Sequence, residues 1–406
     1  MREFRSPLTV LAALIFAGLA CRAQDFGLTL PGRLTLFRPL TGTYQGAFPQ
    51  RPLTASLVGS VGYDDNVLGT HDDRVGSGFA APSLDLAAQI GKERTQLTAY
   101  LQLGLIAYWD IPGQAVQPNI SLDVTFTHQF TPRLVLGLTS YTSYLGQPSF
   151  ALGIGKTSNV GNYVYSSNGI SLGYQWTQRF STATSYTLNA TYYEASTIGT
   201  TGNLLEHIFA QQFRYLLFPT ITAAAEYRFS YEQYVNTTNL DSYSNFALAG
   251  ADFTLSPRLQ FSFRAGGVFQ TDLFHGGNNP SSPYFESTVT YEYRPASFIQ
   301  WYNLYDIERS DTNTADTKDV YRTGLKVLHS FGAKLKLGGG VYYSFNHNHT
   351  APSFDENQLQ ASVTANYLLT RAFALQASYT FIGVLSDITS RSYYRNLTFV
   401  GASFTF

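Results

Sequence analysis

The sequence predicts an all-β fold, a transmembrane up-and-down antiparallel β-barrel of about 18 strands, with 16 as the alternative count. Three observations predict it: the composition, a period-two alternation of apolar and polar residues, and an alternation of short and long connections. Charged residues make up 13% of the chain and aromatic residues 15%, with 29 Tyr and 30 Phe. This charge content is about half that of a soluble globular chain. The formal net charge of −1 gives no reason to expect a nucleic-acid partner.

The first 23 residues have the features of a secretory signal peptide. Arg2 and Arg5 precede the apolar stretch "LTVLAALIFAGLA", and small residues follow it. We expect cleavage after Ala23, because the apolar stretch is too short for a spanning helix. A lipoprotein site at Cys21 is the weaker alternative. Cleavage would remove the single Cys and leave a mature chain without disulfides. Residues 24–51 then form a periplasmic or lumen-entering extension, and residues 52–406 form the barrel.

Period-two alternation predicts the strands. In "NISLDVTFTHQF" (119–130) the residues Ile120, Leu122 and Val124 alternate with polar residues such as Asp123. The same rule holds in "TITAAAEYRFSYE" (220–232) and "QLQASVTANYLL" (358–369). Such runs are typical of strands with one apolar and one polar face. Segment 243–255 has an ambiguous phase, which is why 16 strands remain possible.

The connections predict the topology. Tight turns such as "TPR" at 131 and "SPR" at 256 interleave with long polar segments such as 146–162. This rhythm indicates a meander with both termini at the short-turn end, which faces the periplasm in outer-membrane barrels. Greek-key connections of a soluble sandwich would break the rhythm. We therefore expect the apolar face to contact lipid and the polar face to line a lumen, with aromatic girdles at the loop ends (Tyr63, Tyr108 and Trp109 among others) and near the turns (Phe130, Trp176 and Phe180).

The stretch "LTFVGASFTF" (397–406) continues the alternation to the last residue. Val400, Ala402, Phe404 and Phe406 fall on one face of an extended chain. This pattern resembles the C-terminal signature read by the outer-membrane barrel assembly machinery. We predict that Phe404 and Phe406 are part of an assembly signal.

Two short motifs carry a family resemblance. "GSVGYDDNVLGT" (59–70) and "SYYRNLTFVGASFTF" (392–406) resemble the second putative β-barrel porin family. "KDVYRTGLKV" (318–327) echoes the second motif. The resemblance implies a Gram-negative outer-membrane protein, often associated with exopolysaccharide or surface-polymer gene clusters. The residues that match are Tyr63, Asp64, Asp65, Asn66, Tyr394, Arg395 and Asn396.

The polar faces of the predicted strands carry the charged residues that we expect to line the pore. A lining of both charge signs predicts passive diffusion of polar or carbohydrate-like solutes and no enzymatic activity. The expected pore-lining residues are Asp85, Asp123, Glu226, Arg228, Glu232, Arg264, Glu286, Glu292, Arg294, Arg322, Lys326, Lys334 and Lys336.

Several alternatives stay open at this point. A structural or docking barrel for a secretion partner is the main one. A barrel hydrolase would use Asp64, Asp65, His71 and Asp72, but these residues cluster in a single loop. Carboxylates at 64–73 could hold Ca²⁺, and His347 with His349 could hold a transition metal. Solvated loops account better for both, so we predict no cofactor and no metal site. The expected partners are outer-membrane lipid, the assembly machinery and a polar solute, with the oligomeric state open.

Overall fold

The computed structural model describes residues 52–111, 115–146, 162–194, 202–236, 240–273, 279–310, 317–349 and 352–406. The predicted signal peptide and the extension 24–51 lie outside the described residues. In the part of the chain that is described, no helix has the length and apolarity of a membrane-spanning helix.

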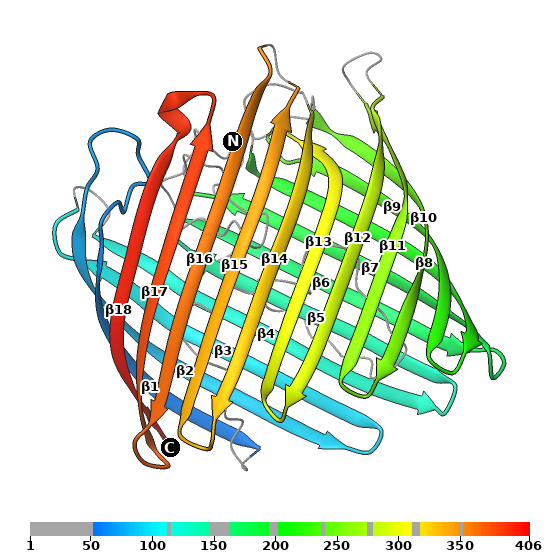
Figure 1. Ribbon diagram of the computed structural model, residues 1–406, viewed down its shortest axis with the longest axis horizontal. Coiled ribbons are helices and arrows are strands. Elements are labelled where there is room, and N and C mark those ends of the chain that lie inside the picture. The colour runs from blue at the N-terminus through cyan, green and yellow to red at the C-terminus, as the bar shows by residue number, and fades with distance from the viewer. Residues whose placement is uncertain are drawn as a thin grey trace, which may run out of the picture.

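The described chain forms one closed sheet of 18 antiparallel strands, each paired with its neighbours in sequence (Figure 1). The first and last strands also pair, in a register that runs from Ser56 opposite Thr405 to Asp64 opposite Leu397. This pairing closes the barrel. The predicted fold class and the strand count of 18 are confirmed.

The strands are 12 to 16 residues long. A single short 3₁₀ helix, η3 (Thr389–Arg391), precedes the last strand in the described part. The strands are β1 (Leu53–Asp64), β2 (Ser77–Lys92), β3 (Thr95–Tyr108), β4 (Val116–Thr131), β5 (Leu134–Leu145), β6 (Tyr163–Gln175), β7 (Phe180–Tyr193), β8 (Leu204–Phe218), β9 (Ile221–Tyr234), β10 (Ser242–Ser256), β11 (Leu259–Asp272), β12 (Ser281–Arg294), β13 (Ser297–Arg309), β14 (Thr317–Phe331), β15 (Leu335–Asn348), β16 (Phe354–Leu368), β17 (Phe373–Ser386) and β18 (Tyr393–Thr405).

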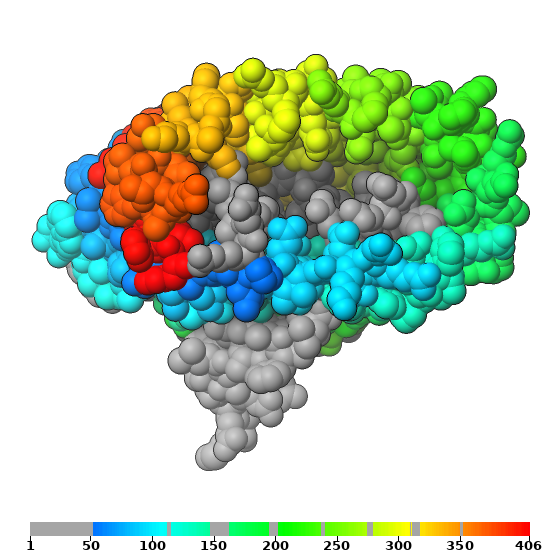
Figure 2. Space-filling view, turned by 90° about the horizontal axis from the view of Figure 1, so that it is seen from below, coloured from blue at the N-terminus to red at the C-terminus, as the bar shows by residue number. Residues whose placement is uncertain are grey.

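The short turns gather at one end of the barrel, which we call the turn end, and the longer connections at the other, the loop end (Figure 1). A recurrent hydroxyl stabilises the turns. Thr131 Oγ1 accepts from Leu134 N at 3.0 Å, and Thr177, Ser256 and Thr370 repeat this contact. Side chains of this type favour tight turns because they bond to nearby backbone amides. Seen from below, the strands form an elongated ring (Figure 2).

The outward face is mainly apolar. Val400, Phe404 and Phe406 lie on it with exposed fractions of 58%, 46% and 56%. Outward polar groups bond to one another, as Ser140 does with Asn168 at 2.7 Å. β10, the strand of ambiguous phase, pairs regularly with β9 and has a single register shift against β11.

The tyrosines of the predicted loop-end girdle divide between the two faces. Tyr63 and Trp109 are exposed at 53% and 65%, but Tyr108 is buried on the inward side. In Tyr393-Tyr394 the first side chain is buried and the second is 41% exposed. Consecutive strand residues point to opposite faces, so a Tyr-Tyr pair cannot contribute twice to one girdle.

Glycines let the sheet curve between β10 and β11. A Cβ on Gly250 would lie 2.0 Å from the Phe263 carbonyl oxygen, and one on Gly266 would lie 1.9 Å from the Ala247 oxygen. These separations exclude any side chain at either position. Glycine at such points allows the tight bending that barrel closure requires.

Candidate functional site

Contacts between strands that are not neighbours identify the lumen side. Arg228 on β9 donates to the Tyr284 hydroxyl on β12 at 2.9 Å. Arg214 on β8 pairs with Asp252 on β10 at 2.7 Å. Side chains can bridge over an intervening strand in this way only on the concave face, so these residues point into the barrel.

The lumen side of strands β8 to β18, which we call the arginine wall, carries paired arginines. Each follows an aromatic residue: the dipeptides are Phe213-Arg214, Tyr227-Arg228, Phe263-Arg264, Tyr321-Arg322 and Tyr394-Arg395. In each dipeptide the arginine is buried, at 1% to 7% exposure. The aromatic ring lies on the opposite face because strand residues alternate.

The turn half of the arginine wall contains a three-residue cluster. Asp252 lies between two guanidinium groups, at 2.7 Å from Arg214 and 2.9 Å from Arg264. The side chains of both arginines are at most 8% exposed. One carboxylate thus links β8, β10 and β11 across the lumen surface.

The Arg228 cluster lies nearer the loop end. Its guanidinium is 2.7 Å from Glu226 and 3.6 Å from Glu286. It also lies over the rings of Phe246 and Tyr284, at 5.4 Å and 5.3 Å from their centroids. Cation–π contacts of this kind are strongest when the cation is desolvated. The Tyr284 hydroxyl donates to Glu286 as well.

The sequence echo at 318–327 repeats the geometry of the terminal motif. Arg322 forms two parallel hydrogen bonds to Glu308 on β13, at 2.6 Å and 2.7 Å. This fork geometry is the strongest form of arginine–carboxylate pair. Buried aromatic and aliphatic side chains, among them Tyr302 and Tyr342, pack along the same wall.

The opposite side of the lumen, strands β2 to β7, is different, and we call it the hydroxyl–amide wall. Every arginine between residues 53 and 193 lies in a connection rather than in a strand. The lumen side carries residues such as Gln102, Ser171 and Thr187, all buried. Its carboxylates include Asp85, which accepts from Ser83 Oγ at 2.9 Å and the Tyr100 hydroxyl at 3.0 Å.

Most of the expected pore-lining residues lie on the lumen side of their strands. Glu292 and Arg294 are exposed at the turn end of β12. Lys334 corrects the expectation: it lies in the connection between β14 and β15, where strand alternation does not set its direction. Those with lumen-side strand positions are Asp85, Asp123, Glu226, Arg228, Glu232, Arg264, Glu286, Arg322, Lys326 and Lys336.

Sequence reasoning missed several lumen charges, each for an identifiable reason. Asp252 lies in the strand of ambiguous phase. Glu356 lies in the polar stretch 347–356, which predicts a loop, but it belongs to β16. Glu308 lies near the end of β13, directly before the polar stretch 309–318. Glu206 and Arg214 share the parity of the buried β8 residues, so alternation alone could have found them.

The two family motifs meet at the barrel seam, where β1 pairs with β18. Asp64 is fully buried and accepts from Arg395 Nε at 3.1 Å, with Arg395 Nη2 also bonded to it. The Tyr108 hydroxyl and the Asn66 backbone amide donate to the same carboxylate. We call this ion pair and its neighbours the seam latch.

Side chain–backbone bonds extend the seam latch into the first loop. Asn396 donates from its backbone amide and its side-chain amide to the two oxygens of Asp65, both at 2.6 Å. Asn66 Nδ2 donates to the Tyr394 and Thr70 carbonyls at 2.9 Å. The motif residues therefore join two chain segments 331 positions apart.

The first loop turns back onto the lumen side beyond the latch. Val67 is 5% exposed and packs with Phe79, Tyr108 and Ile111. The loop's His71 meets the Ser392 carbonyl at 2.7 Å. Its Nε2 is 4.0 Å from Asp72, a surface residue. Of the four residues of the hydrolase alternative, Asp64 and Asp65 are thus engaged by Arg395 and Asn396, and only His71 and Asp72 lie near each other.

The residues of the two metal-site alternatives are also paired with other residues or exposed. His347 pairs with Asp355, and His349 lies 3.1 Å from Asp319. Asp64 and Asp65 are engaged in the seam latch, while Asp72 and Asp73 are exposed. Within the described ranges, no group of three or more His, Cys, Asp or Glu residues has the arrangement of a metal site.

Several solved structures are similar to the chain at low sequence identity. OccAB4 of Acinetobacter baumannii is 11% identical, with a TM-score of 0.41 over 87% of this chain and 98% of that one. OccK3 (OpdO) of Pseudomonas aeruginosa is 12% identical, with a TM-score of 0.41 over 87% and 95%. The siderophore receptor PirA of A. baumannii is 6% identical, with a TM-score of 0.43 over 87% and 80%. No curated protein sequence matches the chain.

The family comparison covers the C-terminal part of the chain, including β12 to β18 and the motif Tyr394-Arg395-Asn396. The first motif, at 63–66, lies outside the matched range. The resemblance is confirmed here: residues 279–406 match the family described as putative beta-barrel porin 2.

Proposed function

We propose that this protein is an outer-membrane channel through which polar solutes diffuse passively. The observation that supports it best is the closed 18-stranded sheet with an apolar outward face and a lumen side rich in polar and charged groups. Barrels of 16 to 18 strands enclose an aqueous channel. An apolar outer band is required where strands contact lipid.

The proposal includes the export signal and the orientation. Residues 1–23 direct secretion and are cleaved after Ala23, the turn end faces the periplasm, and Phe404 with Phe406 serves the assembly machinery. The mature chain then lacks cysteine, so an introduced cysteine is the only thiol that the label can modify. Asp72→Cys in the first loop should react with a membrane-impermeant maleimide on intact cells, and Arg258→Cys in a turn should not. The opposite labelling pattern would refute this orientation.

We further propose that the solutes are hydroxyl-rich and carbohydrate-like, in line with a role in surface-polysaccharide export. The hydroxyl–amide wall supports this, because side-chain amides and hydroxyls both donate and accept hydrogen bonds. Paired arginines on the other wall leave little uncompensated charge, so that wall has no strong preference for ionic over neutral solutes.

Conductance tests the channel directly. Purified mature protein in a planar lipid bilayer should give stable ion-conducting steps, and liposomes containing it should swell in small sugars. If folded protein gives neither conductance nor sugar flux, the channel proposal is refuted. A docking barrel for a secretion partner would then be the better account.

A further inference from the structure

We propose that a cavity at the turn end of β3 to β9 is a binding site for sugar units of an oligosaccharide, which it recognises through their hydroxyls. This inference deepens the proposed channel function. The part of it that places the cavity at the periplasmic mouth of a channel rests on that function. The binding claim itself concerns only the cavity and can be tested without transport.

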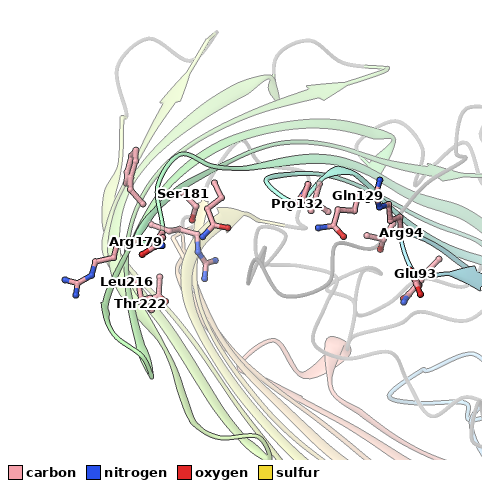
Figure 3. Close-up of a pocket in the computed structure, with 15 residues that line it drawn as sticks. Glu93, Arg94, Gln129, Pro132, Arg179, Ser181, Leu216 and Thr222 are labelled. Carbon is pink, nitrogen blue, oxygen red and sulfur yellow. The ribbon is translucent and has the colours of Figure 1, made fainter.

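The cavity has a volume of about 470 Å³. This lies in the range of ligand pockets, roughly 300–1,000 Å³. Its walls come from the turn ends of several strands, so it is built on the sheet rather than on a long loop. Figure 3 shows Gln129 and Arg94 on one side of it and Leu216 and Thr222 on the other.

The polar lining is dominated by amides and hydroxyls. Four glutamines contribute to it, with Thr127, Ser181 and Thr222; the glutamines are Gln96, Gln129, Gln175 and Gln178. Each glutamine amide offers two donors and an acceptor. Such groups match the vicinal hydroxyls of a sugar, each of which also donates and accepts.

Thr127 points to a ligand independently of the cavity shape. It is 7% exposed, and its Oγ1 has no hydrogen-bond partner among the described residues. A buried hydroxyl without a partner is unfavourable. A sugar hydroxyl in the cavity would provide the missing bond.

The charged groups at the cavity lie around its polar lining and are only partly compensated. Arg214, the buried arginine of the lining, is 2.7 Å from Asp252, a carboxylate that it shares with Arg264. At the rim, Glu93 accompanies Arg94 and Arg179. The lining therefore combines amides and hydroxyls that match sugar hydroxyls with an excess of positive charge, which does not exclude an acidic sugar.

Calorimetric titration of the folded, detergent-solubilised mature barrel tests the site. The probes are maltohexaose, which is neutral, and hexagalacturonate, which is anionic. Wild type should bind maltohexaose through its hydroxyls and hexagalacturonate at least as tightly, because the lining has an excess of positive charge. The double variant Gln129→Leu/Gln175→Leu should lose at least tenfold in affinity. The matched control, Gln300→Leu/Gln360→Leu, changes two lumen-side glutamines on the arginine wall and should bind within twofold of wild type.

Thr127→Val supplies a second variant that keeps the side-chain shape. It removes a hydroxyl with no described partner, so it should keep the heat-modifiable fold while weakening maltohexaose binding about fivefold. If the double variant fails to fold, the maltohexaose affinity of Thr127→Val tests the site by itself. Wild-type maltohexaose affinity in Thr127→Val and in every folded glutamine variant would overturn the site.

The same preparation separates this inference from the channel proposal. Protein that conducts ions but does not bind maltohexaose refutes the sugar site and leaves the channel standing. Protein that binds maltohexaose at the cavity but does not conduct supports the site and refutes the channel.

Discussion

The two walls of the lumen stabilise their buried polar side chains in different ways. On the arginine wall, guanidinium groups such as Arg228 and Arg214 bridge strands that are not neighbours. On the hydroxyl–amide wall, bonds such as that from the Tyr100 hydroxyl to Asp85 join neighbouring strands. Long charged side chains can therefore brace the sheet, whereas short hydroxyls leave room along the wall.

This difference has an energetic consequence. Removing one partner of a buried ion pair leaves an uncompensated charge and costs about 3–5 kcal/mol. Removing a hydroxyl that has no partner costs little. We therefore expect the arginine wall to govern stability and the hydroxyl–amide wall to govern solute contact.

The seam latch should give the largest effect. Arg395→Ala leaves Asp64 buried without its cation, so we expect a loss of about 3–5 kcal/mol in unfolding free energy. Urea titration of the barrel in phospholipid vesicles measures it. Arg258→Ala, an exposed turn position, is the control. Equal stability of the two variants would mean that the motif residues do not hold the seam.

A paired comparison of the two walls comes next. Asp252→Asn leaves Arg214 and Arg264 facing each other without their shared carboxylate, and we expect a loss of about 3 kcal/mol. Thr187→Val on the other wall removes a buried hydroxyl that has no partner in the described part of the chain. Its unfolding free energy should change by less than about 0.5 kcal/mol. Similar losses of unfolding free energy in both variants would contradict the proposed difference between the two walls.

Ion selectivity tests the less buried lysines of the arginine wall. Lys326 and Lys336 lie on the lumen side and are only partly buried. Charge reversal of both to Glu should shift the permeability ratio towards cations by a factor of about 3–10, because lining charges set the local potential. Reversal potentials in a KCl gradient measure this shift. The exposed turn residue Lys334, changed to Glu, should shift the ratio less.

The smallest effect on intrinsic stability should come from the turn end of the seam. Phe406 is 56% exposed and its backbone amide donates to the Ala55 carbonyl at 2.9 Å. Deleting it should lower the unfolding free energy by only about 1 kcal/mol. In cells, the deletion should nevertheless reduce folded outer-membrane protein and induce envelope stress. Wild-type amounts of heat-modifiable barrel in cells would contradict the assembly role.

Local patterns predicted the strands well because they depend on neighbours in sequence. Alternation placed Val400 and Phe404 on the outward face and Asp85 and Arg228 on the lumen side without reference to any distant residue. It failed where a strand extended into a polar segment that predicts a loop, as at Glu356. The aromatic–arginine dipeptides were visible in the sequence and would have located the arginine wall.

By itself, the sequence determined the barrel class and the outward side of most strands, and it favoured 18 strands over 16, because strand periodicity and turn chemistry act over a few residues. Only the tertiary structure decided which carboxylate meets which arginine. Asp64 and Arg395 are 331 positions apart and come together because the sheet closes. Likewise, Asp252 on β10 serves both Arg214 and Arg264 because the curvature of the wall brings β8 and β11 within reach of its side chain.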